Sequence, residues 1–257
     1  AGAMLGAELV AKSPADGYTL LMGTSAELTI GPNLSPGSLR YHPVDDFIPV
    51  ALIGISPNVL LAFPGFAPRN IAELTAYAKA HPQRVSFGSG GAGTGPHLSG
   101  ELLKHMGGIP MTHVPYRGSG PALADLMSGQ TQLMISTMAP ALPLIKSQKV
   151  RALAVTSDRR SGLLPDVPTV AEQGLPGYHA VTWYAVLAPA ATPRDAVERI
   201  RQSIEASLKT PEVQERLGKL GIEPPAAASE SPALQERIRG ELASWAALIK
   251  ETGIRAE

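Results

Sequence analysis

The chain has 257 residues, 44% of them hydrophobic and 17% charged, and its 22 basic and 22 acidic side chains leave no formal net charge. This composition is typical of a folded globular protein, and the lack of a basic surplus argues against a nucleic-acid partner. The absence of cysteine excludes thiolate nucleophiles, cysteine-bound zinc and iron–sulfur clusters.

Short apolar runs alternate along the chain with segments of helical periodicity. Several runs lack polar alternation, which is typical of strands covered on both faces of a mostly parallel sheet. None approaches the ~20 residues needed to cross a bilayer, and no signal-peptide pattern is present. Strands are predicted at 19–23, 49–55, 58–63, 84–89, 111–116, 131–136, 150–157 and 183–189.

The predicted helices carry start and stop signals. Asn70 and Glu73 form a capping-box pattern, and Pro96 opens a helix that Gly107 and Gly108 close. Alternating strands and helices of these lengths predict an α/β fold. Helices are predicted at 71–80, 96–106, 119–128, 193–208, 211–220 and 232–252.

Motifs for catalysis and metal binding are missing. The sequence has no G-x-S-x-G nucleophile elbow, no H-E-x-x-H and no phosphate-binding G-x-x-x-x-G-K-[ST]. Its six histidines include no i,i+4 pair for a helical metal site. We therefore predict no catalytic residue, no metal site and no cofactor.

Residues 86–97, SFGSGGAGTGPH, contain the letters of a dinucleotide fingerprint at Gly88, Gly90 and Gly93. That fingerprint also requires an acidic residue about 20 positions later to bind the ribose, and the following strand, MTHVPYRG, ends without one. A dehydrogenase therefore stays only as a minor alternative. Glycines before a helix N-terminus still suit an anion, and a carboxylate fits as well as a phosphate.

The same arrangement occurs twice more. HVPYRGSGPAL at 113–123 is a strand, a Gly/Ser turn and a helix start, and LLMGTSAE presents Thr24 and Ser25 at a strand end. Alternatives remain at three places: the glycine run as a mobile surface loop, Arg117 as a solvated charge, and His97 as an ordinary first-turn residue.

At these motifs the sequence resembles the solute-binding proteins of tripartite tricarboxylate transporters, the Bug family of periplasmic receptors. The matching stretches follow the family order over nearly the whole chain. They are DGYTLLMGTSA, HPVDDFIPVALIG, FGSGGAGTGPHLSGELL, THVPYRGSGPALADLMSGQ, KVRALAVTSDRRS and LPDVPTVAEQGLPGY.

The resemblance implies a two-lobe periplasmic-binding-protein type II fold with mixed, mostly parallel sheets and a ligand cleft between the lobes. Lobe 1 is expected at 1–59 plus 180–257 and lobe 2 at 60–179. The implied function is a periplasmic, non-enzymatic receptor that closes like a flytrap over a dicarboxylate, tricarboxylate, acidic amino acid or aromatic acid. Its implied partners are membrane transporter subunits, without nucleic acid and without a membrane span of its own.

The family's contacts carry over to the strand ends and turns of this sequence. The implied ligand-binding residues are Thr24, Ser25, Ser89, Gly90, Gly91, Thr94, His97, Tyr116, Arg117, Gly118, Ser119, Ser136 and Thr137.

The sequence departs from the family at two places. Relatives carry a further strand and helix before the segment matching AGAMLGAELVAKS, so we expect lobe 1 to be incomplete. Many relatives have an aspartate after the strand at 131–136, where this chain has neutral residues. A second interpretation, the sensor domain of a LysR-type regulator, shares the two-lobe fold.

Overall fold

The computed structural model describes residues 2–225 and 231–254, which divide into two compact units. Unit 1 comprises residues up to Ile55 together with those from Thr182 onward, and unit 2 runs from Ser56 to Val181. The sequence predicted divisions after residues 59 and 179. That the units act as ligand-binding lobes stays a prediction.

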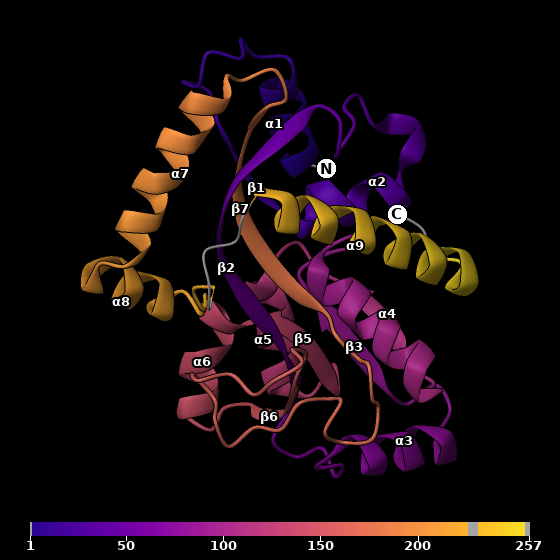
Figure 1. The fold of residues 1–257 in the computed structure, drawn as a ribbon. Coiled ribbons are helices and arrows are strands. Elements are labelled where there is room, and N and C mark those ends of the chain that lie inside the picture. The colour runs from indigo at the N-terminus through magenta and orange to yellow at the C-terminus, as the bar shows by residue number, and fades with distance from the viewer. Residues whose placement is uncertain (1, 226–230, 255–257) are drawn as a thin grey trace. The chain divides into compact units, whose positions relative to one another are not determined.

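Unit 1 holds the N-terminal and C-terminal elements (Figure 1). Its strand β1 pairs antiparallel with β7, which lies next to β2. The elements are α1 (Gly2–Ala11), β1 (Leu21–Thr24), the π-helix η1 (Ala26–Ile30), α2 (Gly31–Leu34), the 3-10 helix η2 (Pro36–Ser38), the first part of β2 (Phe47–Ala62), β7 (Val181–Pro189), α7 (Arg194–Leu208), α8 (Pro211–Lys219) and α9 (Ser231–Thr252).

The core of unit 1 forms where the C-terminal helix returns to the N-terminal segment. Leu234 and Ile238 of α9 are buried with Leu28 of η1 and Trp183 of β7. An apolar stripe of the last helix, which the sequence predicted at 232–252, therefore packs on elements formed early in the chain.

Unit 2 is a five-stranded mixed sheet with helices on both faces (Figure 1). Strand β2 pairs antiparallel with both β5 and β6, while β3 pairs in parallel with β4 and β5. The remaining elements are α3 (Ile71–Ala80), β3 (Ser86–Ser89), α4 (Gly95–Gly107), β4 (Thr112–Pro115), α5 (Ser119–Ser128), β5 (Leu133–Thr137), α6 (Met138–Lys146) and β6 (Arg151–Val155).

Alternation along β2 places different partners on the two faces of this sheet. Val59 and Leu61 belong to a buried cluster that also contains Leu126 of α5 and Met138 of α6. Asn58 points the other way and donates from Nδ2 to Ser99 Oγ of α4, at 2.9 Å. Helix α4 therefore covers one face, and α5 and α6 cover the opposite one.

Two predictions of secondary structure were wrong. The runs at 49–55 and 58–63 form one strand, β2, which continues through Pro57. The missing N–H of this proline is tolerated because the pairing with β5 starts only at Asn58. Helices α1 and α6 were also missed, and α6 contains Pro143 in its interior.

The predicted caps are confirmed. Asn70 accepts a hydrogen bond from Glu73 N–H at 2.8 Å, and Gly108 and Gly129 end α4 and α5 in the left-handed region. Within residues 2–225 and 231–254, none of the helices combines the length and apolarity needed to span a bilayer.

Candidate functional site

The carboxyl ends of four strands meet at one edge of the unit 2 sheet. Because β3, β4, β5 and β6 all run against β2, they end at the edge where β2 enters the unit. Helices α4, α5 and α6 start just after three of these strand ends. Their N-termini therefore gather at the same edge, which is the usual place for a ligand in an open α/β sheet. We call this set of strand ends and helix starts the carboxyl edge.

The glycine run after β3 and the turn after β4 are joined by backbone hydrogen bonds. Tyr116 N–H donates to Ser89 O at 3.2 Å, and Gly118 N–H donates to Gly90 O at 3.1 Å. Gly91 has a φ of +139°, and a Cβ there would lie 3.2 Å from the Tyr116 carbonyl oxygen. This close approach of two backbones explains the glycine, and the contacts make the run an ordered turn.

Thr94 begins α4 and also closes the glycine turn. Its Oγ1 donates to Gly91 O at 2.8 Å and accepts from His97 N–H at 3.4 Å. The hydroxyl that the sequence offered as a ligand donor is therefore already engaged in an N-cap.

His97 is buried in the first turn of α4, where its tautomer can be assigned. Gly93 N–H donates to His97 Nδ1 at 3.1 Å, so that nitrogen must be an acceptor. The proton of the neutral ring then sits on Nε2, which makes no hydrogen bond to any described residue. Burial lowers the pKa of His97 to about 4, which keeps the ring neutral near pH 7.

His113, from β4, fixes Ser89 at the end of β3. Its Nε2 lies 2.7 Å from Ser89 Oγ, which also accepts from Gly91 N–H and donates to Gly91 O. Because the Ser89 hydroxyl donates its hydrogen to Gly91 O, it must accept from His113. The neutral imidazole of His113 therefore carries its proton on Nε2. Burial, together with the neighbouring His97, lowers the pKa of His113 to about 3.

Tyr116 and Arg117 separate after leaving β4. The Tyr116 hydroxyl donates to the Asp125 carboxylate at 2.7 Å, and desolvation with this carboxylate raises the pKa of Tyr116 to about 12. Arg117 is exposed to solvent. The tyrosine hydroxyl is thus held by α5, and the arginine can approach an anion only from the surface.

Hydroxyl groups also stand at the starts of α5 and α6. Ser119 is the first residue of α5 and lies against Gly90, whose added Cβ would be 3.4 Å from Ser119 Oγ. Ser136 is fully buried and donates to Thr137 O at 3.0 Å. In the described chain, neither the Gly118 N-cap of α5 nor the Thr137 N-cap of α6 makes a side-chain capping bond.

Thr24 and Ser25 belong to unit 1, and only the hydroxyl of Thr24 has a hydrogen-bond partner among the described residues. Thr24 N–H and Oγ1 both donate to the Glu27 carboxylate, each at 2.5 Å, while Thr24 Oγ1 accepts from Ala26 N–H. The Glu27 carboxylate therefore already occupies both donors of Thr24. Burial raises the pKa of Glu27. Ser25 Oγ is buried and has no hydrogen-bond partner in the part of the chain that the structure describes.

The structure thus brings most of the expected residues of unit 2 to one edge, where backbone groups and neutral side chains hold Ser89, Thr94 and His97, and the Asp125 carboxylate holds Tyr116. It adds residues that the sequence did not indicate, namely Asn58, Ser99, His113 and Thr156. His113 lies 24 positions from Ser89 in sequence, and the parallel register of β3 and β4, which pairs Phe87 with His113, brings the two together. No sequence signal marks it.

Comparisons of the sequence with a family model and with individual proteins point to the same receptor family. A family model described as the tripartite tricarboxylate transporter family receptor matches residues 1–254. Protein BugT of Bordetella pertussis is 36% identical over 256 residues, which cover 99% of this chain and 78% of that protein.

Two solved structures combine similarity with a named ligand. Rpa4515 of R. palustris, solved with adipate, has a TM-score of 0.85 and 35% identity, covering 99% of this chain and 84% of that one. MatC of Rhodopseudomonas palustris, solved with malate, has a TM-score of 0.81 and 32% identity, covering 97% and 85%. The fold is α/β with mixed sheets, and the chain belongs to the tripartite tricarboxylate transporter receptor family.

Proposed function

We propose that the chain is a periplasmic solute-binding receptor that captures a small organic carboxylate and delivers it to a tripartite tricarboxylate-type membrane transporter. The observation that carries this proposal is the carboxyl edge of unit 2, where three helix N-termini and several hydroxyls converge. Helix N-termini and hydroxyls bind a carboxylate without a formal positive charge. The adipate and malate bound to the similar proteins are ligands of this class.

The contacts come from the turns at the carboxyl edge. At the starts of α5 and α6, the N-cap residue makes no side-chain capping bond within the described residues. The backbone N–H groups of these first turns are therefore available to donate to the carboxylate. His97 adds a neutral Nε2–H donor. The remaining proposed contacts are Ser89, Gly90, Gly91, Thr94, Tyr116, Arg117, Gly118, Ser119, Ser136 and Thr137 in unit 2, with Thr24 and Ser25 in unit 1.

In this proposal, binding proceeds by closure of the two units over the ligand, as the family resemblance implies. Exclusion of water strengthens hydrogen bonds between neutral donors and an anion, since the local dielectric constant falls. The family match favours a receptor over the LysR-type sensor. A dinucleotide site is disfavoured because the residue that follows β4 is Tyr116 and not an acidic residue.

Isothermal titration calorimetry tests the proposal with adipate, succinate, malate, citrate, aspartate, glutamate and benzoate. We expect saturable binding of at least one acid. Ser119→Ala should weaken it, whereas Ser128→Ala, at the exposed far end of the same helix, should not. A folded protein that gives no heat with any of these acids would contradict the proposal.

A further inference from the structure

A buried asparagine beside the carboxyl edge has an acceptor without a donor. Asn58 is fully buried on β2, and in the described chain its Oδ1 has no hydrogen-bond partner. A buried acceptor left unsatisfied costs roughly 1–3 kcal/mol. Such an atom therefore calls for a donor that the described protein does not supply.

The orientation of this amide is fixed by its other partners. Nδ2 donates to Ala180 O at 3.3 Å and to Ser99 Oγ at 2.9 Å. The carbonyl can only accept, and the Ser99 hydroxyl has already placed its hydrogen on Gly95 O at 2.9 Å. Exchanging Oδ1 and Nδ2 would put acceptor against acceptor, so the atom without a partner is the oxygen.

The backbone of Asn58 is equally fixed. Asn58 N–H donates to Thr156 Oγ1 at 2.8 Å, and Asn58 O accepts from Thr156 N–H at 3.0 Å. Thr156 follows the end of β6, at the carboxyl edge. The hydrogen bonds of its amide nitrogen and of its backbone therefore hold the acceptor in place, and it cannot turn to find another partner.

Asn58 lies beside one of the proposed ligand contacts. It is directly opposite Thr137, the N-cap of α6, in the register of β2 and β5. Ser56, on the same face of β2, also has a buried hydroxyl without a partner among the described residues. The unsatisfied Asn58 Oδ1 thus belongs to the residue that pairs with the N-cap of α6, one of the helix N-termini that we propose bind the carboxylate.

From this geometry we propose that Asn58 is a specificity-determining residue, whose Oδ1 accepts a hydrogen bond from a hydroxyl or ammonium group on the ligand. This inference rests on the proposed receptor function and narrows its ligand class to carboxylic acids that carry a donor next to the carboxylate. Acids with the same skeleton but no donor leave Oδ1 unsatisfied and bind more weakly.

The test compares matched pairs of acids by titration calorimetry on the wild-type protein. The pairs are succinate and malate, glutarate and 2-hydroxyglutarate, and 3-phenylpropanoate and phenyllactate. We expect about tenfold or greater preference for the hydroxy acid in the pair that binds best, which corresponds to about 1.4 kcal/mol. For a succinate skeleton, 2-methoxysuccinate, which keeps the oxygen but lacks the donor hydrogen, should lose this preference.

A pair of variants separates recognition from stability. Asn58→Leu should reduce the hydroxy-acid preference to about twofold or less. Asn33→Leu is the control, because Asn33 in unit 1, like Asn58, donates from Nδ2 to two acceptors, in its case the backbone carbonyls of Thr29 and Leu242, both at 2.9 Å. It should lower the melting temperature and leave the preference unchanged.

The outcomes distinguish the two proposals. Binding of acids with a wild-type preference below about twofold in every pair, or binding of unsubstituted acids alone, overturns the role of Asn58 and leaves the receptor function standing. A preference that survives Asn58→Leu also overturns it, as expected if Asn58 only holds a structural water. If no acid binds to the folded protein, the receptor function itself fails.

Discussion

The imidazole rings of His97 and His113 stack in unit 2, with their centroids 3.9 Å apart and their planes inclined by 18°. They come from α4 and β4, and each is held by a neighbour in the glycine turn: His97 by Gly93 N–H and His113 by Ser89 Oγ. Two protonated rings at this separation would repel each other. The stack therefore favours the neutral form of both rings, each of which carries an Nε2–H donor.

The first prediction concerns pH and stability. Both histidines have folded pKa values, about 4 and about 3, below the value of about 6.5 in an unfolded chain. As the pH falls below about 6.5, these histidines are protonated in the unfolded chain but stay neutral in the folded chain. The free energy of unfolding therefore decreases toward pH 4. The contribution is complete above pH 6.5. Thermal unfolding followed from about pH 7 to about pH 4.5 measures this.

Variants isolate the histidine contribution from that of buried carboxylates. Burial raises the pKa of Glu27 and Glu241, so these two groups favour the folded state at low pH and act in the opposite direction. His97→Gln should give a shallower loss of stability on acidification. His81→Gln is the control, because His81 is exposed and stacks on Tyr77. An equal change of slope in both variants would refute the prediction.

The second prediction concerns the glycine turn. Gly91→Ala should lower the free energy of unfolding by about 1–3 kcal/mol, because the alanine must adopt a positive φ and its Cβ would lie 3.2 Å from Tyr116 O. Gly90→Ala should cost less than about 1 kcal/mol, since its Cβ would meet Ser119 Oγ at an ordinary 3.4 Å. Urea denaturation compares the two, and equal costs would show that the turn tolerates side chains at both positions.

The third prediction concerns the contact between α4 and β3. A Cβ on Gly100 would overlap Phe87 Cε2, and Phe87 is fully buried. Gly100→Ala should therefore destabilise the protein by about 1–3 kcal/mol despite the better helix propensity of alanine.

The matched control for this change is Gly120→Ala in α5. A Cβ on Gly120 would meet no atom of the described residues within 4 Å. Alanine there should be neutral or stabilising by up to about 1 kcal/mol. Circular dichroism melting curves of both variants provide the comparison, and a stable Gly100→Ala would show that Phe87 can move away.

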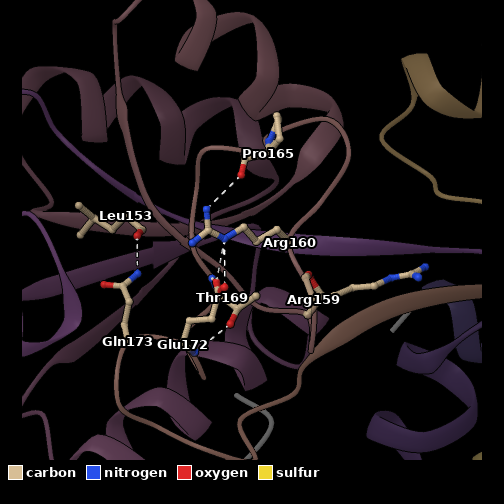
Figure 2. A network of polar contacts seen from close by, with 8 residues as sticks. Leu153, Arg159, Arg160, Pro165, Thr169, Glu172 and Gln173 are labelled. Atoms are coloured by element: carbon tan, nitrogen blue, oxygen red, sulfur yellow. Dashed lines mark hydrogen bonds and ion pairs between the residues drawn. The ribbon is translucent and has the colours of Figure 1, made fainter.

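The fourth prediction concerns the irregular segment after β6, which Figure 2 shows. Thr169 Oγ1 accepts from Glu172 N–H at 2.9 Å, and Glu172 accepts from Thr169 N–H at 2.7 Å and from Arg160 Nε at 3.0 Å. Thr169→Ala breaks this capping box and should cost about 1 kcal/mol. Arg160→Met should cost less, because the ion pair it removes is exposed.

Chemical denaturation of the two single variants ranks these contributions. The Glu172 carboxylate keeps its bond from the Thr169 amide in Arg160→Met, whereas Thr169→Ala leaves the Glu172 N–H without its acceptor. A larger loss in Arg160→Met than in Thr169→Ala would mean that the ion pair, rather than the capping box, holds the segment.

Local interactions are what the sequence alone could predict. Asn70 caps α3 and Gly108 ends α4 because these features depend on residues within one turn of each other. The glycine run before α4 was likewise readable, since glycines followed by a helix start are a contiguous pattern. The α/β fold followed from the alternation of such segments, and the family resemblance from their order.

Only the tertiary structure decided which distant residues meet. Asn58 is 122 positions from Ala180, yet its amide binds that carbonyl, and His113 reaches Ser89 because β3 and β4 are neighbours in one particular register. Strand order, register and side-chain direction arise from packing of the whole unit, and for that reason a linear pattern does not contain them.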